Sequence, residues 1–270
     1  MRIYNNPSAI NTQTQLASSN VAMSKSLEKL STGLRVNRAA DDAAGLSVSE
    51  GLRSQIRGDT MAQRNSNDGL AMLQIAESGT QMITDSLQRM RELAIQSSNG
   101  TYTDTDRKYI QAEFTALKSE ITRIAQATTY NGVNLLATTS SFSFQVSSAN
   151  AGNSSTISFS VATNLSGDLA LGGVGTQATA QTAIASIDTA LGSVLSMRSD
   201  VGAAMNRLEK TVANLGSMIT NTTDAESRIR DTDFASESTK FTRNQILTNS
   251  ATSMLAQANQ LPQGVLSLLR

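Results

Sequence analysis

The sequence predicts a mainly α-helical protein, a long antiparallel helical coiled-coil rod with one small β-hairpin. Only two prolines occur, Pro7 and Pro262, and a proline inside a helix costs about 3 kcal/mol or more. Between them, apolar residues recur at alternating spacings of three and four through most of the chain, which is typical of helices packed along their length. The exception is the stretch 138–182, which is rich in Ser, Thr, Gly and Ala.

Composition excludes several functional classes. The chain has 270 residues, 22 basic and 22 acidic side chains, and no Cys or His. Without Cys and His it has no disulfide framework, no ordinary zinc site and no Ser–His–Asp triad. Zero net charge gives no general attraction to nucleic acid. We therefore expect no catalytic residue, no cofactor, no metal and no nucleic-acid partner.

Membrane insertion and a cleaved signal are not expected either. No run of 18 apolar residues occurs, which is the length that a membrane-spanning helix needs. The first 20 residues lack the apolar core of a secretory signal peptide. The protein is therefore expected to stay in the cytoplasm or to leave by a route that needs no cleaved signal.

Three helical segments are predicted for the rod, at about 42–98, 104–128 and 184–219. In the second segment, Asp104 to Asp106 precede the apolar stripe and can cap the helix. Asn131-Gly132 ends this segment. Helices before and after the middle stretch must pair antiparallel, which brings both chain ends to one pole. The predicted rod core includes Leu87, Met90, Leu117, Ile121, Val201 and Leu208.

The two end segments, about 8–34 and 247–268, are also amphipathic, but neither can bury its stripe alone. Short isolated helices are marginal in water, and polar residues in a seam select its partner and register. We predict that the two stripes pair and that the pair packs against identical pairs of other subunits. These polymerisation residues are Leu16, Met23, Leu27, Leu30, Leu247, Met254, Leu261 and Leu268.

In the middle stretch, two runs alternate between apolar and polar residues. Phe142, Phe144 and Val146 form the first, and Ile157, Phe159 and Val161 the second. The turn-forming residues between them predict a β-hairpin.

Three polar features have structural interpretations. Asp41-Asp42 is expected to cap the helix that begins at Ala43, because adjacent carboxylates do not share a helix face. The cluster Gly172–Gly175 lacks phosphate-loop spacing and predicts a flexible loop. The basic stretch is interleaved with acidic residues and has no aromatic residue to stack a base, which favours ion pairing; its members are Arg35, Arg38, Arg53, Arg57 and Arg64.

The chain resembles the bacterial flagellins, of the short kind. The N-terminal signature is LEKLSTGLRVNRAADDAAGLSVSEGLRSQIRG at 27–58, followed by QRNSNDGLAMLQIAESG at 63–79. LQRMRELAIQSSNG at 87–100, IQAEF at 110–114 and TTYNGVNLL at 128–136 continue it. The C-terminal match is RIRDTDFASESTKFTRNQILTNSATSMLAQANQLPQGVLSLL at 228–269. Six such pieces in the right order are very specific.

The resemblance implies an architecture with an inner helical domain, D0, and an outer rod, D1. It places the N-terminal D0 helix at 1–33, a spoke linker at 34–46 and the N-terminal D1 helices at 47–130. The β-hairpin and loop part of D1 would span 131–182, the C-terminal D1 helix 183–222, and the C-terminal linker with its D0 helix 223–270. The start of the chain departs from the family, because it carries Pro7 and few large apolar residues.

The resemblance also implies function and partners. Such chains polymerise with themselves into the flagellar filament for swimming motility, and leave through the flagellar type III apparatus without a cleaved signal. Expected partners are an export chaperone, the hook–filament junction proteins and the filament cap. The site that Toll-like receptor 5 recognises in some flagellins matches Arg89, Leu93 and Glu113. The alternatives are a hook–filament junction protein and, less favoured, a secreted hydrolase or a DNA-compacting protein.

Overall fold

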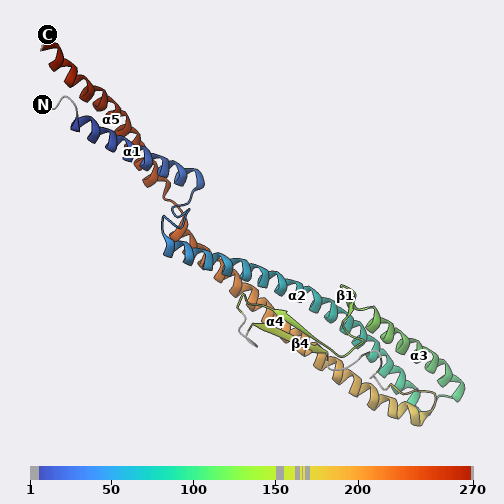
Figure 1. Ribbon diagram of the computed structural model, residues 1–270. Coiled ribbons are helices and arrows are strands. Elements are labelled where there is room, and N and C mark those ends of the chain that lie inside the picture. Colours follow the sequence, from blue (N-terminus) through green and yellow to red (C-terminus); the bar gives the residue numbers. More distant parts are fainter. Residues whose placement is uncertain (1–5, 150–154, 162–164, 166, 168–170, 269–270) are drawn as a thin grey trace. The chain divides into compact units, whose positions relative to one another are not determined.

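The computed structural model describes residues 6–149, 155–161, 165, 167 and 171–268, with the backbone alone for 261–268. Five helices and four short strands occur in this part of the chain (Figure 1). They form two compact units, the end unit (1–54 with 221–270) and the rod unit (55–220). The predicted mainly helical class is confirmed.

The helices are long because little in the sequence stops them. Their bounds are α1 Pro7–Thr32, α2 Ala43–Ser98, α3 Asp104–Ala127, α4 Gln177–Arg230 and α5 Phe234–Leu268. α2 and α4 have 56 and 54 residues, about 80 Å each at 1.5 Å per residue. α4 continues eight residues past the end at 222 that the resemblance implied, because 221–230 contains neither Gly nor Pro.

In the rod unit, α2, α3 and α4 lie side by side (Figure 1). The predicted stripe of α2 is buried from Leu73 to Ala94. On α4, one row of residues spaced by seven is at most 3% exposed: Ile187, Val194, Val201, Leu208 and Leu215. The alternate row of the same stripe is only half-buried. The core is therefore a narrow seam along the rod.

The β-hairpin of β3 (Ser140–Gln145) and β4 (Thr156–Val161) has the predicted alternation. Phe142 pairs with Phe159 and Phe144 with Ile157, so one face of the ladder carries the apolar side chains. The rings of Phe142 and Phe159 stack with centroids 6.5 Å apart. The hairpin lies close to α2, where a Cβ at Gly69 would come 3.0 Å from the Phe144 ring.

A second, smaller hairpin differs from the sequence prediction. α3 ends at Ala127, and Asn131 and Gly132 form the turn between β1 (Thr129–Tyr130) and β2 (Val133–Asn134). Both turn residues have positive φ, 49° and 77°, as the two-residue turns of hairpins require. The Asn-Gly pair thus closes a hairpin and does not itself end the helix.

The N-cap of α2 is the predicted one, whereas the N-cap of α3 is one residue before the predicted Asp104. Asp42 accepts a hydrogen bond from the N–H of Gly45 at 2.9 Å and so caps α2, as expected. For α3 the N-cap is Thr103. Its hydroxyl accepts from the N–H of Asp106, and the Asp106 carboxylate accepts from the N–H of Thr103, which makes a capping box.

Candidate assembly surfaces

In the end unit, α1 and α5 form an antiparallel pair whose seam consists of small residues. Ser19 and Ser26 on α1 are buried, and so are Ala251 and Ala258 on α5. Each couple is seven residues apart, as a coiled-coil seam requires. Small side chains let the two helices approach closely, but they bury little apolar surface, so this seam alone contributes little hydrophobic stabilisation.

The large apolar residues of the end unit lie mostly outside this seam. Leu16, Met23 and Leu30 are half-buried, whereas Leu27 is 56% exposed. Leu247 and Met254 are 43% and 58% exposed. The contact between α1 and α5 within one copy thus differs from the predicted pairing of large apolar residues. The two helices approach closely at the Ala and Ser positions, and this leaves the larger side chains at the margins of the seam. The side chains of Leu261 and Leu268 lie outside the described residues.

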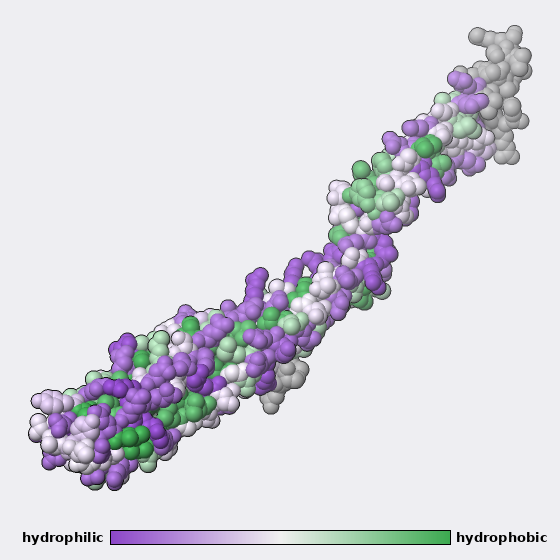
Figure 2. All heavy atoms as spheres, turned by 180° about the vertical axis from the view of Figure 1, so that it is seen from behind, coloured by the Kyte–Doolittle hydropathy of each residue, from purple (hydrophilic) through white to green (hydrophobic). Residues whose placement is uncertain are grey.

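Further exposed apolar side chains extend this surface on both helices. They include Ile10 and Val21 on α1, and Phe234 and Ile246 on α5, all more than half exposed. Figure 2 shows green, apolar atoms on the outer surface of the end pair. A shallow groove of about 480 Å³ runs beside Ile246 and Leu247, with Thr242 and Arg243 among its lining residues. We call the exposed residues Ile10, Val21, Leu27, Phe234, Ile246, Leu247 and Met254 together the outer face of the end pair, although they lie on more than one side of each helix.

One buried carboxylate ties the pair together. Glu237 on α5 is 7% exposed and bonds the Ser26 hydroxyl across the seam. Burial would raise the pKa of this carboxyl, but Ser26, Lys240 and Lys29 together hold the pKa below its ordinary value of 4.5. Lys240 lies 3.1 Å from the carboxylate. The charged form is thereby accommodated inside the pair.

Each helix of this pair contains one of the two prolines of the sequence. Pro7 is the first residue of α1, where its missing N–H costs nothing, and Asn6 is its N-cap. Pro262 lies inside α5, so it offers no N–H to the carbonyl of Ala258 four residues earlier. The Asn6 side-chain amide donates to that carbonyl at 2.8 Å. One helix therefore supplies the donor that the other lacks, which fixes their register.

The linkers of the end unit are held by backbone pairing. Leu34 and Asp231 form an antiparallel bridge, and the N–H of Thr232 donates to the Gly33 carbonyl at 2.9 Å. The guanidinium of Arg35 donates to the Arg228 and Ile229 carbonyls at the end of α4. These bonds satisfy carbonyls that a helix end leaves without partners.

Two of the five arginines of the basic stretch, Arg38 and Arg53, form ion pairs. Arg38 pairs with Glu28 at 2.9 Å, and Arg53 with Glu50 at 2.9 Å. Arg230 also contacts Glu50, at 2.8 Å. The hydrogen bonds from Arg230 and then Arg53 lower the pKa of the Glu50 carboxyl. The interpretation as structural ion pairing is confirmed for Arg38 and Arg53.

The rod positions lie mostly where the heptads put them. Leu87, Met90, Ile121, Val201 and Leu208 are at most 2% exposed, and Leu117 is half-buried against the same core. Elsewhere on α2 and α3, the Arg89 guanidinium bonds Glu92 and Glu113, which raises the pKa of Arg89. Leu93 is 1% exposed and belongs to the hydrophobic core of the rod unit.

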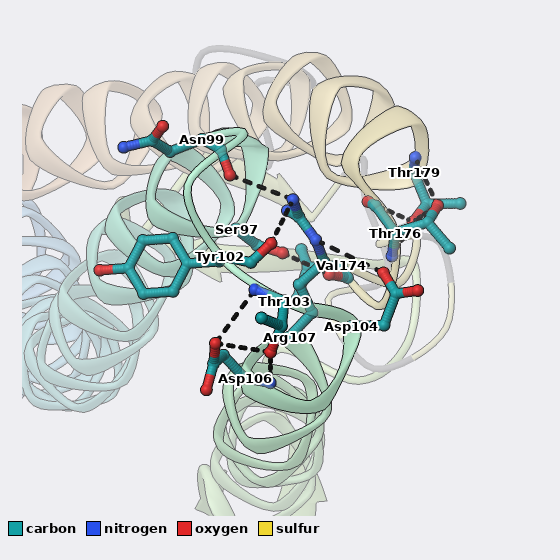
Figure 3. Close-up of polar contacts among 10 residues, drawn as sticks. All are labelled: Ser97, Asn99, Tyr102, Thr103, Asp104, Asp106, Arg107, Val174, Thr176 and Thr179. Carbon is teal, nitrogen blue, oxygen red and sulfur yellow. Dashed lines mark hydrogen bonds and ion pairs between the residues drawn. The ribbon is translucent and has the colours of Figure 1, made fainter.

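The turn between α2 and α3 forms a polar pole of the rod unit (Figure 3). Arg107 is 5% exposed, and its Nη2 donates to the carbonyls of Asn99 and Tyr102, both at 3.1 Å. The Ser97 hydroxyl donates to the Val174 carbonyl at 2.6 Å. Gly172–Gly175 is a loop as predicted, but Val174 within it is fully buried and held on both its carbonyl and its N–H.

Several of these residues give little signal in a sequence. Ser19 and Ser26 do not stand out as an apolar stripe, although their spacing of seven is visible once small residues are counted with large ones. Ala251 and Ala258, by contrast, lie on the spacing of the apolar stripe predicted for the last segment. Glu237 carries no sequence signal for burial. Within the described residues, no helix is long and apolar enough to cross a membrane, and no group of three acidic residues is arranged to hold a metal.

Comparison with known proteins places the chain. Residues 3–141 match the bacterial flagellin N-terminal helical region, and residues 184–269 the bacterial flagellin C-terminal helical region. The flagellar filament 33 kDa core protein of Treponema phagedenis is 43% identical over 287 residues, covering all of both chains. Flagellin FlaB2 of Treponema pallidum (strain Nichols) is 41% identical, and the flagellin of Bacillus subtilis (strain 168) 40%, again over both full chains. The chain belongs to the bacterial flagellin family.

Proposed function

We propose that this protein is the structural subunit of a flagellar filament. The observation that carries the proposal is the outer face of the end pair, where seven large apolar side chains stand 43–64% exposed: Ile10, Val21, Leu27, Phe234, Ile246, Leu247 and Met254. Exposed apolar patches of this kind mark interaction sites. Relatives that match the chain along its full length are named flagellins or filament core proteins, which supports a partner that is another copy.

The rod unit and the end pair are expected to contribute differently to assembly. The rod unit has its own core of large residues and can fold before assembly. The end pair has only a small-residue seam, so it gains its main apolar burial when copies stack. A repeated contact of this kind that does not close on itself produces an open helical filament.

Seeded growth tests the proposal. Purified protein is added to short filament seeds under salting-out conditions, and the seeds are imaged by electron microscopy. A filament subunit extends them without another protein. The second candidate, a hook–filament junction protein, needs no self-propagating lattice and would leave seed length unchanged.

We further propose the localisation and partners that the resemblance implies. The protein would leave the cytoplasm through the flagellar type III apparatus without a cleaved signal, and reside in the filament outside the cell. An export chaperone, the junction proteins and the cap would bind its termini, where the outer face offers apolar surface. Pull-down of the export chaperone by wild-type protein, but not by a chain lacking 234–268, would support this assignment.

Recognition by Toll-like receptor 5 is a narrower proposal. Of the three predicted residues, the Arg89–Glu113 pair is accessible, with side chains 50% and 48% exposed, whereas Leu93 is buried in the core. Arg89→Ala should therefore weaken receptor binding by soluble monomer more than Leu93→Val. Equal binding by Arg89→Ala and the wild type would overturn the assignment.

A further inference from the structure

A cleft in the rod unit contains a buried acid with an unused oxygen. The cleft has a volume of about 600 Å³ and lies among α2, the β3–β4 hairpin and α4. Asp59 on α2 lines it and is 1% exposed. Within the described residues, its Oδ2 has no hydrogen-bond partner. Burying a carboxylate oxygen without a hydrogen-bond donor costs free energy, so a donor from another molecule would stabilise the cleft.

The rest of the lining gives this cleft a mixed character. Val146, Ile157, Leu215 and Met218 supply the apolar part of the lining. Arg207 and Lys210 on α4 are exposed at its rim and form no ion pair within the described part of the chain. A fitting occupant therefore combines an apolar body, a hydrogen-bond donor at its tip and a nearby negative charge.

One exposed side chain of this protein has that combination. Tyr109 on α3 is 72% exposed. Two of its neighbours on that helix face, Thr105 and Ala112, are small, and a third, Glu113, is paired with Arg89. Asp106 lies one turn earlier on the helix, and its hydrogen bonds with Thr103 keep the pKa of that carboxyl below its ordinary value. The other strongly exposed aromatic residue of the described chain, Phe234, has no donor.

A single copy cannot make this contact. Glu113 is level with Arg89, which it pairs with at 2.9 Å, so Tyr109 lies level with about residue 93 of α2. Asp59 is then some 34 residues away along that helix, roughly 50 Å at 1.5 Å per residue. The cleft and Tyr109 thus lie toward opposite ends of the rod unit. Only a second copy can bring them together, and such a head-to-tail contact propagates as an open filament.

We propose that the Asp59 cleft receives Tyr109 of a second copy, with the phenol O–H donating to Oδ2 of Asp59. The ring packs against Ile157 and Met218, and Asp106 of the incoming copy faces Arg207 and Lys210. This inference rests on the proposed function, because it assigns one contact between rods in the filament. It adds a polar, directional contact to the apolar contact of the end pair.

Crosslinking tests the contact directly, since the natural chain has no Cys. Filaments of the Tyr109→Cys/Met218→Cys variant are treated with a short bifunctional maleimide and denatured. The contact predicts a ladder of dimers, trimers and longer products. The matched control replaces Met218→Cys by Leu195→Cys, which is exposed on the same helix outside the cleft and should give no ladder. Filaments visible by microscopy with no ladder from the Tyr109–Met218 pair would overturn the proposal while leaving the filament function intact.

A substitution cycle supplies the second measurement, should the crosslinking variant not polymerise. Tyr109→Phe and Asp59→Asn should each raise the critical concentration for growth about tenfold, as expected for a hydrogen bond to a charged acceptor. The double variant should be no worse than either single one, since both remove the same bond. Tyr102→Phe deletes a hydroxyl at the same pole and should change growth less than twofold. Additive effects, or normal growth by Tyr109→Phe, would show that Asp59 serves only the monomer.

Discussion

The end pair and the rod use the same heptad spacing for opposite purposes. In the rod, the row with a spacing of seven on α4 consists of large residues, such as Val201 and Leu208, and they are fully buried. In the end pair, the buried row consists of Ser and Ala, and the large residues Leu27 and Met254 face outward. Burial of large residues makes a unit stable by itself, whereas their exposure makes a unit that is completed by other copies.

The largest effect on this contrast is expected from a charge on the outer face. Met254→Asp places a carboxylate where copies would pack, and an unpaired buried charge costs several kcal/mol at each added subunit. Seed extension should stop, while the melting temperature of the monomer stays unchanged because the rod core does not include Met254. Met254→Leu is the control and should grow normally. If Met254→Asp extended seeds, the outer face would not be an assembly surface.

The converse change is Leu208→Ala in the rod. Leu208 is fully buried, so its truncation should cost about 2–5 kcal/mol of monomer stability. Leu195→Ala on the same helix is a matched control, since Leu195 is 53% exposed and should change stability by less than about 0.5 kcal/mol. Thermal unfolding of the monomer measures both. Similar melting of the two variants would contradict the assignment of the rod seam.

A glycine pair gives a test with opposite signs. A Cβ at Gly79 would lie 2.7 Å from the Thr128 hydroxyl and 2.9 Å from Leu136, so Gly79→Ala should destabilise the rod by about 1–3 kcal/mol. Gly192 has nothing within 4 Å, so Gly192→Ala should stabilise it by up to about 1 kcal/mol through helix propensity. Denaturant unfolding of the two variants compares them. Stabilisation by both would mean that Thr128 and Leu136, which flank the small hairpin, do not pack closely on α2.

The register of the end pair offers a smaller effect. Asn6→Ala removes the donor to the Ala258 carbonyl and should weaken filament growth by about 1 kcal/mol, a rise of roughly fivefold in critical concentration. Pro262→Ala restores an N–H within α5, so Asn6→Ala should cost less in that background. Equal costs in both backgrounds would show that the Asn6 amide does not compensate for the N–H that Pro262 lacks.

The smallest expected effect is a pH dependence of the rod. Hydrogen bonds from the Thr103 hydroxyl and N–H lower the pKa of Asp106 below its ordinary value of 3.8. A carboxyl with a lowered folded-state pKa contributes stability that is full above 3.8 and is lost as the pH falls through the folded-state value. Monomer melting should therefore drop less between pH about 5 and about 3 in Asp106→Asn than in the wild type. An identical drop in melting temperature in both proteins would show that groups other than Asp106 cause the acid sensitivity.

The sequence predicts the large-residue seams well, because Leu73 to Ala94 and Ile187 to Leu215 repeat a contrast in size and polarity that only packed helices explain. It predicts the small-residue seam poorly. Ala251 lies on the predicted stripe of the last helix, but Ser19 and Ser26 are buried by how closely the two backbones approach, and neither helix sequence alone specifies that distance. Asn131-Gly132 carried a hairpin signal that a helix-stop interpretation hid. The Asp59 cleft joins three distant segments, so no local pattern could reveal it.

Amide hydrogen exchange of monomer and filament, residue by residue, tests the central claim most directly. In the monomer we expect fast exchange across about 6–32 and 234–268, because the end pair buries few large side chains, and slow exchange along the seams of α2, α3 and α4. In the filament the two end segments should become as protected as the rod. Equal protection of ends and rod already in the monomer would contradict the account, since the end pair would then be complete without other copies.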